Sequence, residues 1–417
     1  MESLTEDLWT MVLARLPIKI STGLKIVCKQ WKSIVESPFF REVFQSMHQN
    51  SSSSSWSLMS RFDEDPEIVG HYQCDTWGLD RSLGSFIKSF LADKQQKHKD
   101  QRVSVEAYSD VGLILIHVES TDREKGVIYV ANPVSRECVE ILIPDPLPKR
   151  FGTYEYSFLW QWGLVTRTEN GVLLGYKVIL IDKLLRDRKL SCRIYSSETG
   201  LWSLETFHLP YSFNHHYFSG YPISLNGNLH WLGWNNDRHD IVLSMDMYAT
   251  CTGSDRCRVT PFPDLEKTTM FKRFCTPCQG FLMYMNITKV DGSLEDKLCL
   301  WKLQSGGWQL ISEISPDLTL AGLDCSPSLM INPLDAKTAY FWSNKQERLL
   351  SINLHNGKKF VIHNQFEARI FLTRQRERES FDVRIYYIPF ILPQWLHRIP
   401  NTVSIKQPLT TTAILHG

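Results

Sequence analysis

The stretch Val27-Cys28-Lys29-Gln30-Trp31-Lys32-Ser33-Ile34, followed by Ser37-Pro38-Phe39-Phe40, is the most distinctive part of this chain of 417 residues. Its apolar positions have the spacing of an α-helix, and the Ser-Pro pair predicts where that helix ends. The preceding helix carries a one-sided apolar stripe of Leu8, Met11, Val12 and Leu16. Pro17 ends that helix and can begin the next one, because its missing N–H would have no partner in a first turn.

The N-terminal part of the chain is therefore predicted to be a small unit of three helices, the last of which starts near Phe39 and Phe40. A unit of this size buries too little surface to be robust alone. Its apolar stripes are also more numerous than three short helices need for packing on one another. We therefore expect part of this apolar surface to face a partner.

Residues 4–40 resemble an F-box, above all in Leu16-Pro17 and in the stretch 27–34. The resemblance implies a three-helix module that binds the SKP-type adaptor of a cullin–RING ubiquitin ligase. Carried over position by position, it implies that the adaptor contacts Leu4, Leu8, Val12, Leu16, Pro17, Leu24, Val27, Cys28 and Trp31. The chain departs from the family at Thr5, where proline is usual, and this leaves the strength of the first adaptor contact open.

Two other interpretations of the helices are available. A helical hairpin could simply pack on the downstream domain. A helix-turn-helix DNA reader is disfavoured, because a reading helix should expose Arg, Asn or Gln to base edges. Here the most distinctive positions of the second helix are apolar.

A polar segment at residues 46–56, which contains a serine run at 51–55, is predicted to be a linker. Beyond it, helical periodicity is largely lost. Short runs rich in Val, Ile, Tyr, Phe and Trp alternate with Gly, Asn, Asp and Ser turns, which predicts a large all-β region. The aromatic share of 12% suits many short strands around thin cores.

A loose repeat runs through the β region. One phrase, a strand, a polar turn and a second strand, recurs at residues 127–144, 193–210, 298–310 and 349–362, with a degenerate copy at 241–246. A second phrase, at 222–232, places Asn226-Gly227 between two strands, a strong hairpin signal. Residues 110–116 resemble its second half. Two hairpins per repeat give the four strands of one propeller blade, and a repeat of about 50 to 65 residues allows six or seven blades.

This region resembles the F-box-associated domain of plant F-box proteins, a kelch-like propeller. The matching phrases lie at 112–115, 132–144, 176–178, 195–202 and 225–231, whereas the kelch double glycine is clear only at Gly306-Gly307. The resemblances imply a multidomain α+β chain: a small three-helix F-box at 1–45, the Ser-rich linker at 46–56, an all-β, kelch-like β-propeller at 57–400, and a tail at 401–417.

Composition excludes several classes of function. The chain has 46 Lys+Arg against 45 Asp+Glu, which argues against a global basic field for nucleic acid or anionic lipid. Its acidic start is unlike a signal peptide, and no apolar stretch reaches the length of a membrane span. The 10 scattered cysteines indicate reduced thiols, and so a cytoplasmic or nuclear protein.

No catalytic, cofactor or metal site is predicted. Cys275-Thr276-Pro277-Cys278 has the spacing of a redox motif or half a zinc site, but the second ligand pair and the strand–helix context are missing. We expect buried, inert thiols there. We interpret His215-His216 as part of a solvated loop, because one adjacent pair is no ligand set.

The resemblance implies a non-catalytic substrate-recognition subunit of an SKP–cullin–F-box ubiquitin ligase. The F-box would dock on the adaptor and, through it, on a cullin and a RING subunit. The propeller would hold an unidentified protein substrate through residues that one sequence does not reveal. Two alternatives stay open: a binding module that acts outside any ligase, and a propeller that binds another ligand, such as a carbohydrate, or is itself catalytic.

Overall fold

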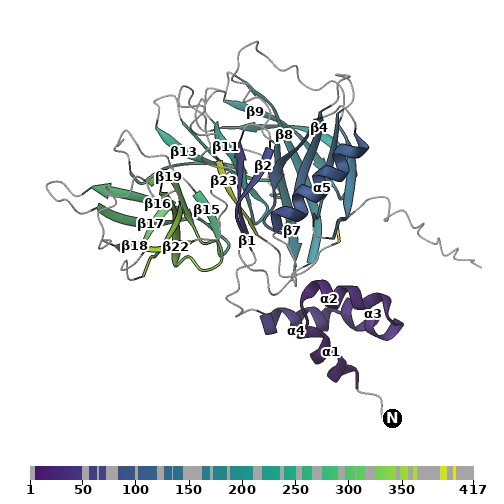
Figure 1. Cartoon of the computed structure of the whole chain (residues 1–417). Coiled ribbons are helices and arrows are strands. Elements are labelled where there is room, and N and C mark those ends of the chain that lie inside the picture. The colour runs from purple at the N-terminus through teal and green to yellow at the C-terminus, as the bar shows by residue number, and fades with distance from the viewer. Residues whose placement is uncertain are drawn as a thin grey trace, which may run out of the picture.

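The structure is a computed structural model. It describes residues 5–48, 56–62, 65–71, 83–98, 102–119, 126–133, 135–143, 162–169, 172–185, 188–209, 218–234, 239–249, 256–264, 275–289, 296–305, 307–314, 325–343, 348–355, 360–363, 386–391 and 398–400. Within these residues, a helical unit comes first and a large domain of β-sheets follows (Figure 1). This order and these two classes of structure confirm the predicted fold class.

The helical unit contains α1 (Glu6–Ala14), α2 (Ile18–Gly23), the 3-10 helix η1 (Leu24–Ile26), α3 (Lys29–Glu36) and α4 (Pro38–His48). The prediction of one continuous second helix is wrong, because the chain breaks before α3. Cys28 is extended there, with φ −156° and ψ 162°, and its Sγ accepts a hydrogen bond from Trp31 N at 3.4 Å. The apolar spacing continues across this break, so periodicity alone does not reveal it.

The described part of the β-domain forms six antiparallel sheets, one of three strands and five of four. Sheet 1 consists of β2 (Asp65–His71), β1 (Trp56–Phe62) and β23 (Tyr386–Ile391). Sheet 2 consists of β3 (Arg102–Tyr108), β4 (Ile114–Glu119), β5 (Val127–Ala131) and β6 (Cys138–Leu142). Sheet 3 consists of β7 (Trp162–Glu169), β8 (Val172–Leu185), β9 (Lys189–Ser196) and β10 (Leu201–His208).

The other three sheets repeat this order. Sheet 4 consists of β11 (Phe218–Leu225), β12 (Asn228–Trp234), β13 (Asp240–Asp246) and β14 (Cys257–Pro261). Sheet 5 consists of β15 (Cys275–Cys278), β16 (Phe281–Lys289), β17 (Asp296–Gln304) and β18 (Gly307–Ile314). Sheet 6 consists of β19 (Cys325–Ile331), β20 (Thr338–Ser343), β21 (Arg348–Asn353) and β22 (Phe360–His363).

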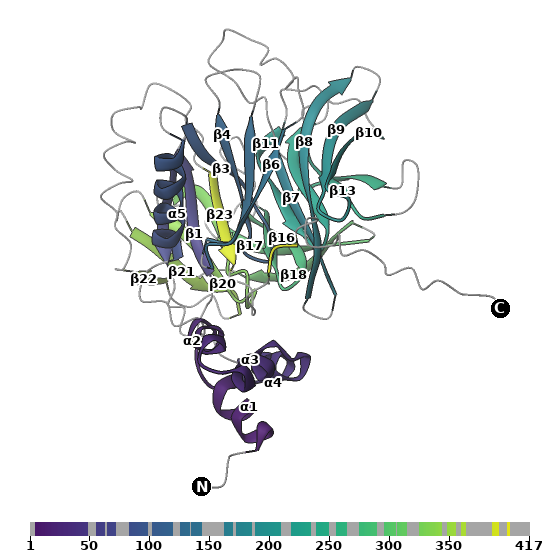
Figure 2. The same ribbon diagram turned by 90° about the vertical axis from the view of Figure 1, so that its right-hand side faces the viewer.

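The sheets follow one another in chain order, as the blades of a β-propeller do (Figure 2). Their innermost strands contact one another in sequence: β2 with β3, β3 with β7, β7 with β11, β11 with β15, and β15 with β19. Sheet 1 joins the two ends of the domain, because β1 pairs with β23 and Trp56 lies opposite Ile391. The predicted number of blades, six or seven, stays a prediction.

The repeated phrases occupy equivalent places in the sheets. The first phrase forms the outer hairpins β5–β6, β9–β10, β17–β18 and β21–β22, and its degenerate copy is β13, which pairs with β14. The second phrase is the inner hairpin β11–β12, where Asn226 and Gly227 have φ of 49° and 75°. Two successive left-handed residues define the tight hairpin turn that Asn-Gly favours.

The tips of the inner hairpins are hydrogen-bonded to one another around the centre. Asp110, in the β3–β4 turn, accepts a bond of 2.8 Å from the backbone N of Asn226. The Asn226 side chain donates to the Gly280 carbonyl at 2.9 Å, and the Gln279 side chain donates to the Leu334 carbonyl at 3.0 Å. This end of the β-domain is therefore tied together across sheets 2, 4, 5 and 6.

One helix of the β-domain was not predicted. Helix α5 (Leu83–Lys97) contacts β1, β2 and β3, and Ile87 and Phe90 are buried beneath it. Leu91 packs partly against the same apolar cluster. The sequence has the spacing of a helix face at Leu83, Phe86, Ile87, Phe90 and Leu91, but strand-like sequence surrounds this segment and obscured the signal.

Candidate functional site

Helix α1 has a buried face and an exposed face. Leu13 and Ala14 are buried in the core of the helical unit. Leu8 and Val12, both predicted to contact an adaptor, are instead 50% and 45% exposed. Two large apolar side chains one helical turn apart therefore face outward on the same helix.

The connection from α1 to α3 presents a second part of this surface. The buried Ser21 hydroxyl donates to the Leu13 carbonyl at 2.9 Å, which holds α2 against the end of α1. Val27 follows η1 and is 59% exposed, and Cys28 is exposed beside it. The extended backbone at Cys28 turns the chain into α3, so the side chain of Val27 lies at the break between helices.

Trp31 connects the exposed surface with the core. It is half-buried, packs against the core cluster, and its ring centroid lies 5.1 Å from that of Trp9. Leu16 and Leu24 are half-buried against the same cluster. Three of the predicted contact residues therefore also support the helical unit itself.

The helical unit has a core that does not use the exposed residues. Ile34, Val35, Phe40 and Phe44 are fully buried. The ends of the helices are also fixed by polar contacts: Ser37 Oγ accepts from Phe40 N at 3.0 Å, and His48 Nε2 lies 2.9 Å from the Ala14 carbonyl oxygen. The core of the described unit is therefore closed by residues other than the exposed apolar ones.

The predicted contact residues divide into three groups. Leu4 lies outside the described residues. Leu8, Val12, Val27 and Cys28 are exposed, whereas Leu16, Pro17, Leu24 and Trp31 are half-buried. Four further apolar residues are exposed in the structure but were not among the predicted adaptor contacts, namely Met11, Ile20, Ile26 and Phe39. Ile26 is 90% exposed, and its apolar character beside Val27 was the only signal in the sequence.

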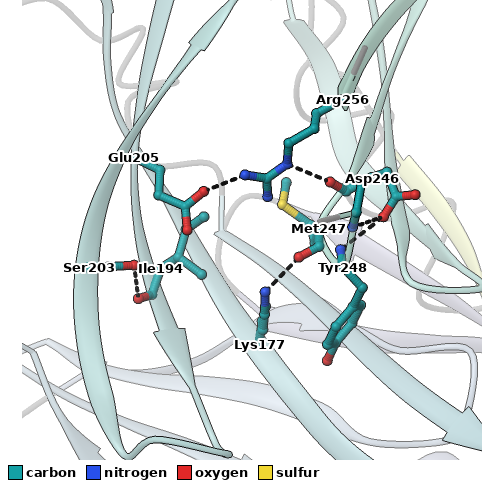
Figure 3. A network of polar contacts seen from close by, with 9 residues as sticks. Lys177, Ile194, Ser203, Glu205, Asp246, Met247, Tyr248 and Arg256 are labelled. Carbon is teal, nitrogen blue, oxygen red and sulfur yellow. Dashed lines mark hydrogen bonds and ion pairs between the residues drawn. The ribbon is translucent and has the colours of Figure 1, made fainter. Parts of the chain in front are cut away.

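A separate polar cluster joins sheets 3 and 4 (Figure 3). Lys177 Nζ donates to the Met247 carbonyl at 2.6 Å, and Arg256 donates to Glu205 Oε2 at 2.8 Å (Figure 3). The Lys177 ammonium also lies 4.7 Å from the ring centroid of Tyr248. Burial lowers the pKa of Lys177, and Glu205 opposes this shift. Because protein groups already satisfy these charges, we interpret the cluster as a structural link between two sheets.

The cysteine pair in β15 is buried, as predicted. Cys278 Sγ donates to the Asn332 carbonyl at 3.2 Å, and burial raises the pKa of this thiol to about 12. A thiol with such a pKa is protonated near neutral pH and is a poor nucleophile and metal ligand. Across the described ranges, no group of three or more His, Cys, Asp or Glu side chains could hold a metal ion. His215-His216 lies outside the described residues.

Two protein-family models match the chain. Residues 1–42 match the F-box domain, and residues 54–401 match the family described as F-box protein At3g26010-like, beta-propeller. The chain belongs to the plant F-box proteins with a β-propeller. No described helix of this F-box protein is long and apolar enough to cross a membrane.

Known relatives of this F-box protein match most of its length. It is 50% identical to F-box protein At3g28330 of Arabidopsis thaliana over 97% of each chain. It is also 50% identical to putative F-box protein At3g28280 of the same plant, over 71% of this chain and 91% of the relative. Putative F-box/kelch-repeat protein At1g15680 of Arabidopsis thaliana is 33% identical over 96% of each chain.

Proposed function

We propose that this F-box protein is the substrate-recognition subunit of an SKP–cullin–F-box ubiquitin ligase. In this proposal the helical unit binds the SKP-type adaptor and, through it, a cullin and a RING subunit. The β-propeller binds the protein to be ubiquitinated. Both the adaptor and the target are proteins, so this chain works by holding two partners in one assembly.

The exposed apolar surface of the helical unit is the observation that carries the proposal. Leu8, Val12 and Val27 are about half-exposed although the unit has a complete core without them. Covering the exposed part of each side chain contributes on the order of 1 kcal/mol, which favours burial against a partner. Membership of the F-box family supports an SKP-type adaptor as that partner.

The proposed mechanism is proximity. The chain contributes effective concentration and orientation, while the bound enzymes transfer ubiquitin to a lysine of the target. The buried Cys278 and the satisfied Lys177–Glu205–Arg256 cluster support a non-catalytic role, because neither offers a free reactive group. The reduced thiols expected from the sequence lead us to propose that the chain acts in the cytoplasm or the nucleus.

Adaptor binding by purified proteins tests this function. The full chain is mixed with a plant SKP-type adaptor and compared with a chain that lacks residues 1–45. We expect the full chain to bind and the shortened chain not to bind. Equal binding by both chains, or binding by neither, would contradict the proposal. Adaptor binding without recovery of the cullin would instead support a module that acts outside a ligase.

Point variants locate the binding surface. Val12→Asp and Val27→Asp place a charge on the exposed apolar surface without touching the buried core, so each should weaken adaptor binding at least tenfold. Leu201→Asp is the matched control, because Leu201 is an exposed leucine of β10 in the β-domain. Unchanged affinity for both helical variants would show that the adaptor uses another surface.

A further inference from the structure

The helical unit meets the β-domain at a row of charged side chains. Arg398 Nη2 lies 3.6 Å from Glu36 Oε1, and the same oxygen lies 3.7 Å from Lys25 Nζ. Burial lowers the pKa of Lys25, Glu36 opposes that shift, and Arg398 adds to it. Glu137 of the β-domain acts on Lys25 as well. Charges from both parts of the chain therefore lie within electrostatic reach of one another.

Residues 398–400 are attached to the β-domain beside this contact. Ile399 packs against the apolar cluster between sheets 2 and 3, to which Leu115 and Val178 belong. Arg398, the preceding residue, reaches the helical unit at Glu36. A segment of three residues thus contacts α3 through Arg398 and the β-domain through Ile399.

The turn that carries Glu137 is fixed on its other side. Asn132 N donates to the Glu137 carbonyl at 2.9 Å across this turn. Arg136 has a left-handed backbone with φ 61°, and its guanidinium pairs with Asp93 and donates to Ser89 Oγ of α5. These contacts fix the described residues of the turn to the β-domain, within electrostatic reach of Lys25.

Apolar packing accompanies these charges. The buried side chains of Leu13 and Phe44 in the helical unit belong to one apolar cluster with Ile87 and Phe90 of α5 and Phe390 of β23. Both views place the helical unit at one end of the β-domain (Figures 1 and 2). The arrangement of the two parts therefore depends on packing as well as on charge.

We propose that residues 398–400 form a strap that holds the helical unit in one orientation on the β-domain. Ile399 anchors the strap between sheets 2 and 3, and Arg398 holds α3 at Glu36. The role of the strap rests on the proposed function, because a fixed orientation would set the direction in which a bound target faces the ligase. Neither Glu36 nor Arg398 belongs to the predicted adaptor contacts, so orientation and adaptor binding can be measured separately.

Single-molecule energy transfer in the full chain tests the strap. Dyes are attached through unnatural amino acids at the exposed positions Lys32 and Thr199, one in each part, which leaves the native thiols unlabelled. The unaltered chain should give one narrow distribution of transfer efficiency. Arg398→Glu should raise the share of molecules outside it by roughly two- to fivefold, the effect of losing and reversing one exposed ion pair. Ile399→Ser, which removes the anchor, should have a larger effect.

Two further variants make the result specific. The exchange Glu36→Arg with Arg398→Glu should restore most of the narrow distribution, because opposite charges face each other again. Arg258→Glu reverses an exposed charge of β14 at a position away from α3 and should change nothing. An unchanged distribution in both Arg398→Glu and Ile399→Ser would overturn the strap. Adaptor affinity is measured in parallel: its absence in the unaltered chain would contradict the proposed function and leave the strap untouched.

Discussion

The indole rings of Trp9 and Trp31 lie with their centroids 5.1 Å apart and tilted by 57°, which joins α1 to α3 across the helical unit. Aromatic pairs at this separation contribute beyond the area they bury. Trp31 is also a predicted adaptor contact, so we expect this one side chain to act in both the stability of the unit and its binding.

Trp31→Ala should therefore have two measurable effects. We expect the free energy of unfolding of the helical unit to fall by about 2 kcal/mol, because half of a large side chain and the pair with Trp9 are lost. Adaptor affinity should fall by a further factor of about 30 or more at a temperature where the variant is folded. Trp301→Ala, which truncates a half-buried tryptophan of β17, should leave adaptor affinity unchanged. Adaptor binding by folded Trp31→Ala at unaltered affinity would remove Trp31 from the interface.

Thr5→Pro should be tolerated at the start of α1. Thr5 has φ −63° and ψ 157°, and proline has a φ fixed near this value. The substitution restricts the unfolded chain, so we expect the free energy of unfolding to rise by about 0.4 to 1 kcal/mol. Hydrogen exchange of the α1 amides measures this change. Faster exchange of the α1 amides in the variant would contradict this expectation and show that the backbone N–H of Thr5 stabilises the start of α1.

Two glycine substitutions should act in opposite directions. Gly227 has φ +75°, and an added Cβ would lie 3.0 Å from the Tyr248 ring, so Gly227→Ala should lower the stability of the β-domain by about 1 kcal/mol or more. Gly23 has helical backbone angles and open space around its Cα, so Gly23→Ala should stabilise the helical unit by about 0.5 to 1 kcal/mol. Thermal unfolding, monitored by hydrogen exchange of the amides in the helical unit and in the β-domain, measures the stability change of each variant. The same sign for the two variants would contradict the assigned backbone conformations.

His230 should make the β-domain sensitive to mild acid. It lies buried in β12 opposite Ser244 of β13, with Nδ1 2.8 Å from Ser244 Oγ, and burial lowers its pKa from 6.5 to about 4. Between these two values the unfolded chain binds a proton that the folded chain does not, so stability falls as pH drops from 6.5 towards 4. The loss is on the order of 3 kcal/mol at most.

Urea unfolding at a series of pH values measures this effect. His230→Gln keeps a polar group of similar size but does not titrate, so the slope of stability against pH between 4 and 6.5 should become smaller. His208→Gln, at an exposed position of β10, is the control and should keep the original slope. An identical slope in the chain with His230→Gln would assign the acid sensitivity to other groups.

Much of the fold could be predicted because its signals are local. The outer hairpins repeat a short phrase, and Asn226-Gly227 specifies a turn by backbone chemistry alone. The break at Cys28 could not be predicted, since apolar spacing is the same on both sides of it. The turn at Gln279-Gly280, with φ of 50° and 79°, was not recognised as an inner hairpin because its sequence lacks the Asn-Gly pair.

The candidate site was less predictable than the fold. Apolar spacing shows which residues can share a face, but it does not show which face the core will use. Leu13, Ile34 and Phe40 are buried in the core, whereas the apolar residues Met11, Ile26 and Phe39 are exposed. The contact of Glu36 with Arg398 joins residues at opposite ends of the chain, and no local pattern indicates such a pair.

The pairing of β1 with β23 has a consequence during synthesis. The β-domain cannot complete sheet 1 until Ile391 has left the ribosome, whereas the residues of the helical unit emerge more than 300 positions earlier. At ordinary rates of translation this delay is on the order of half a minute. If the helical unit binds an adaptor as proposed, a nascent chain would bind the adaptor before its β-domain is complete, and a chain that ends before β23 would compete with the intact protein for the adaptor.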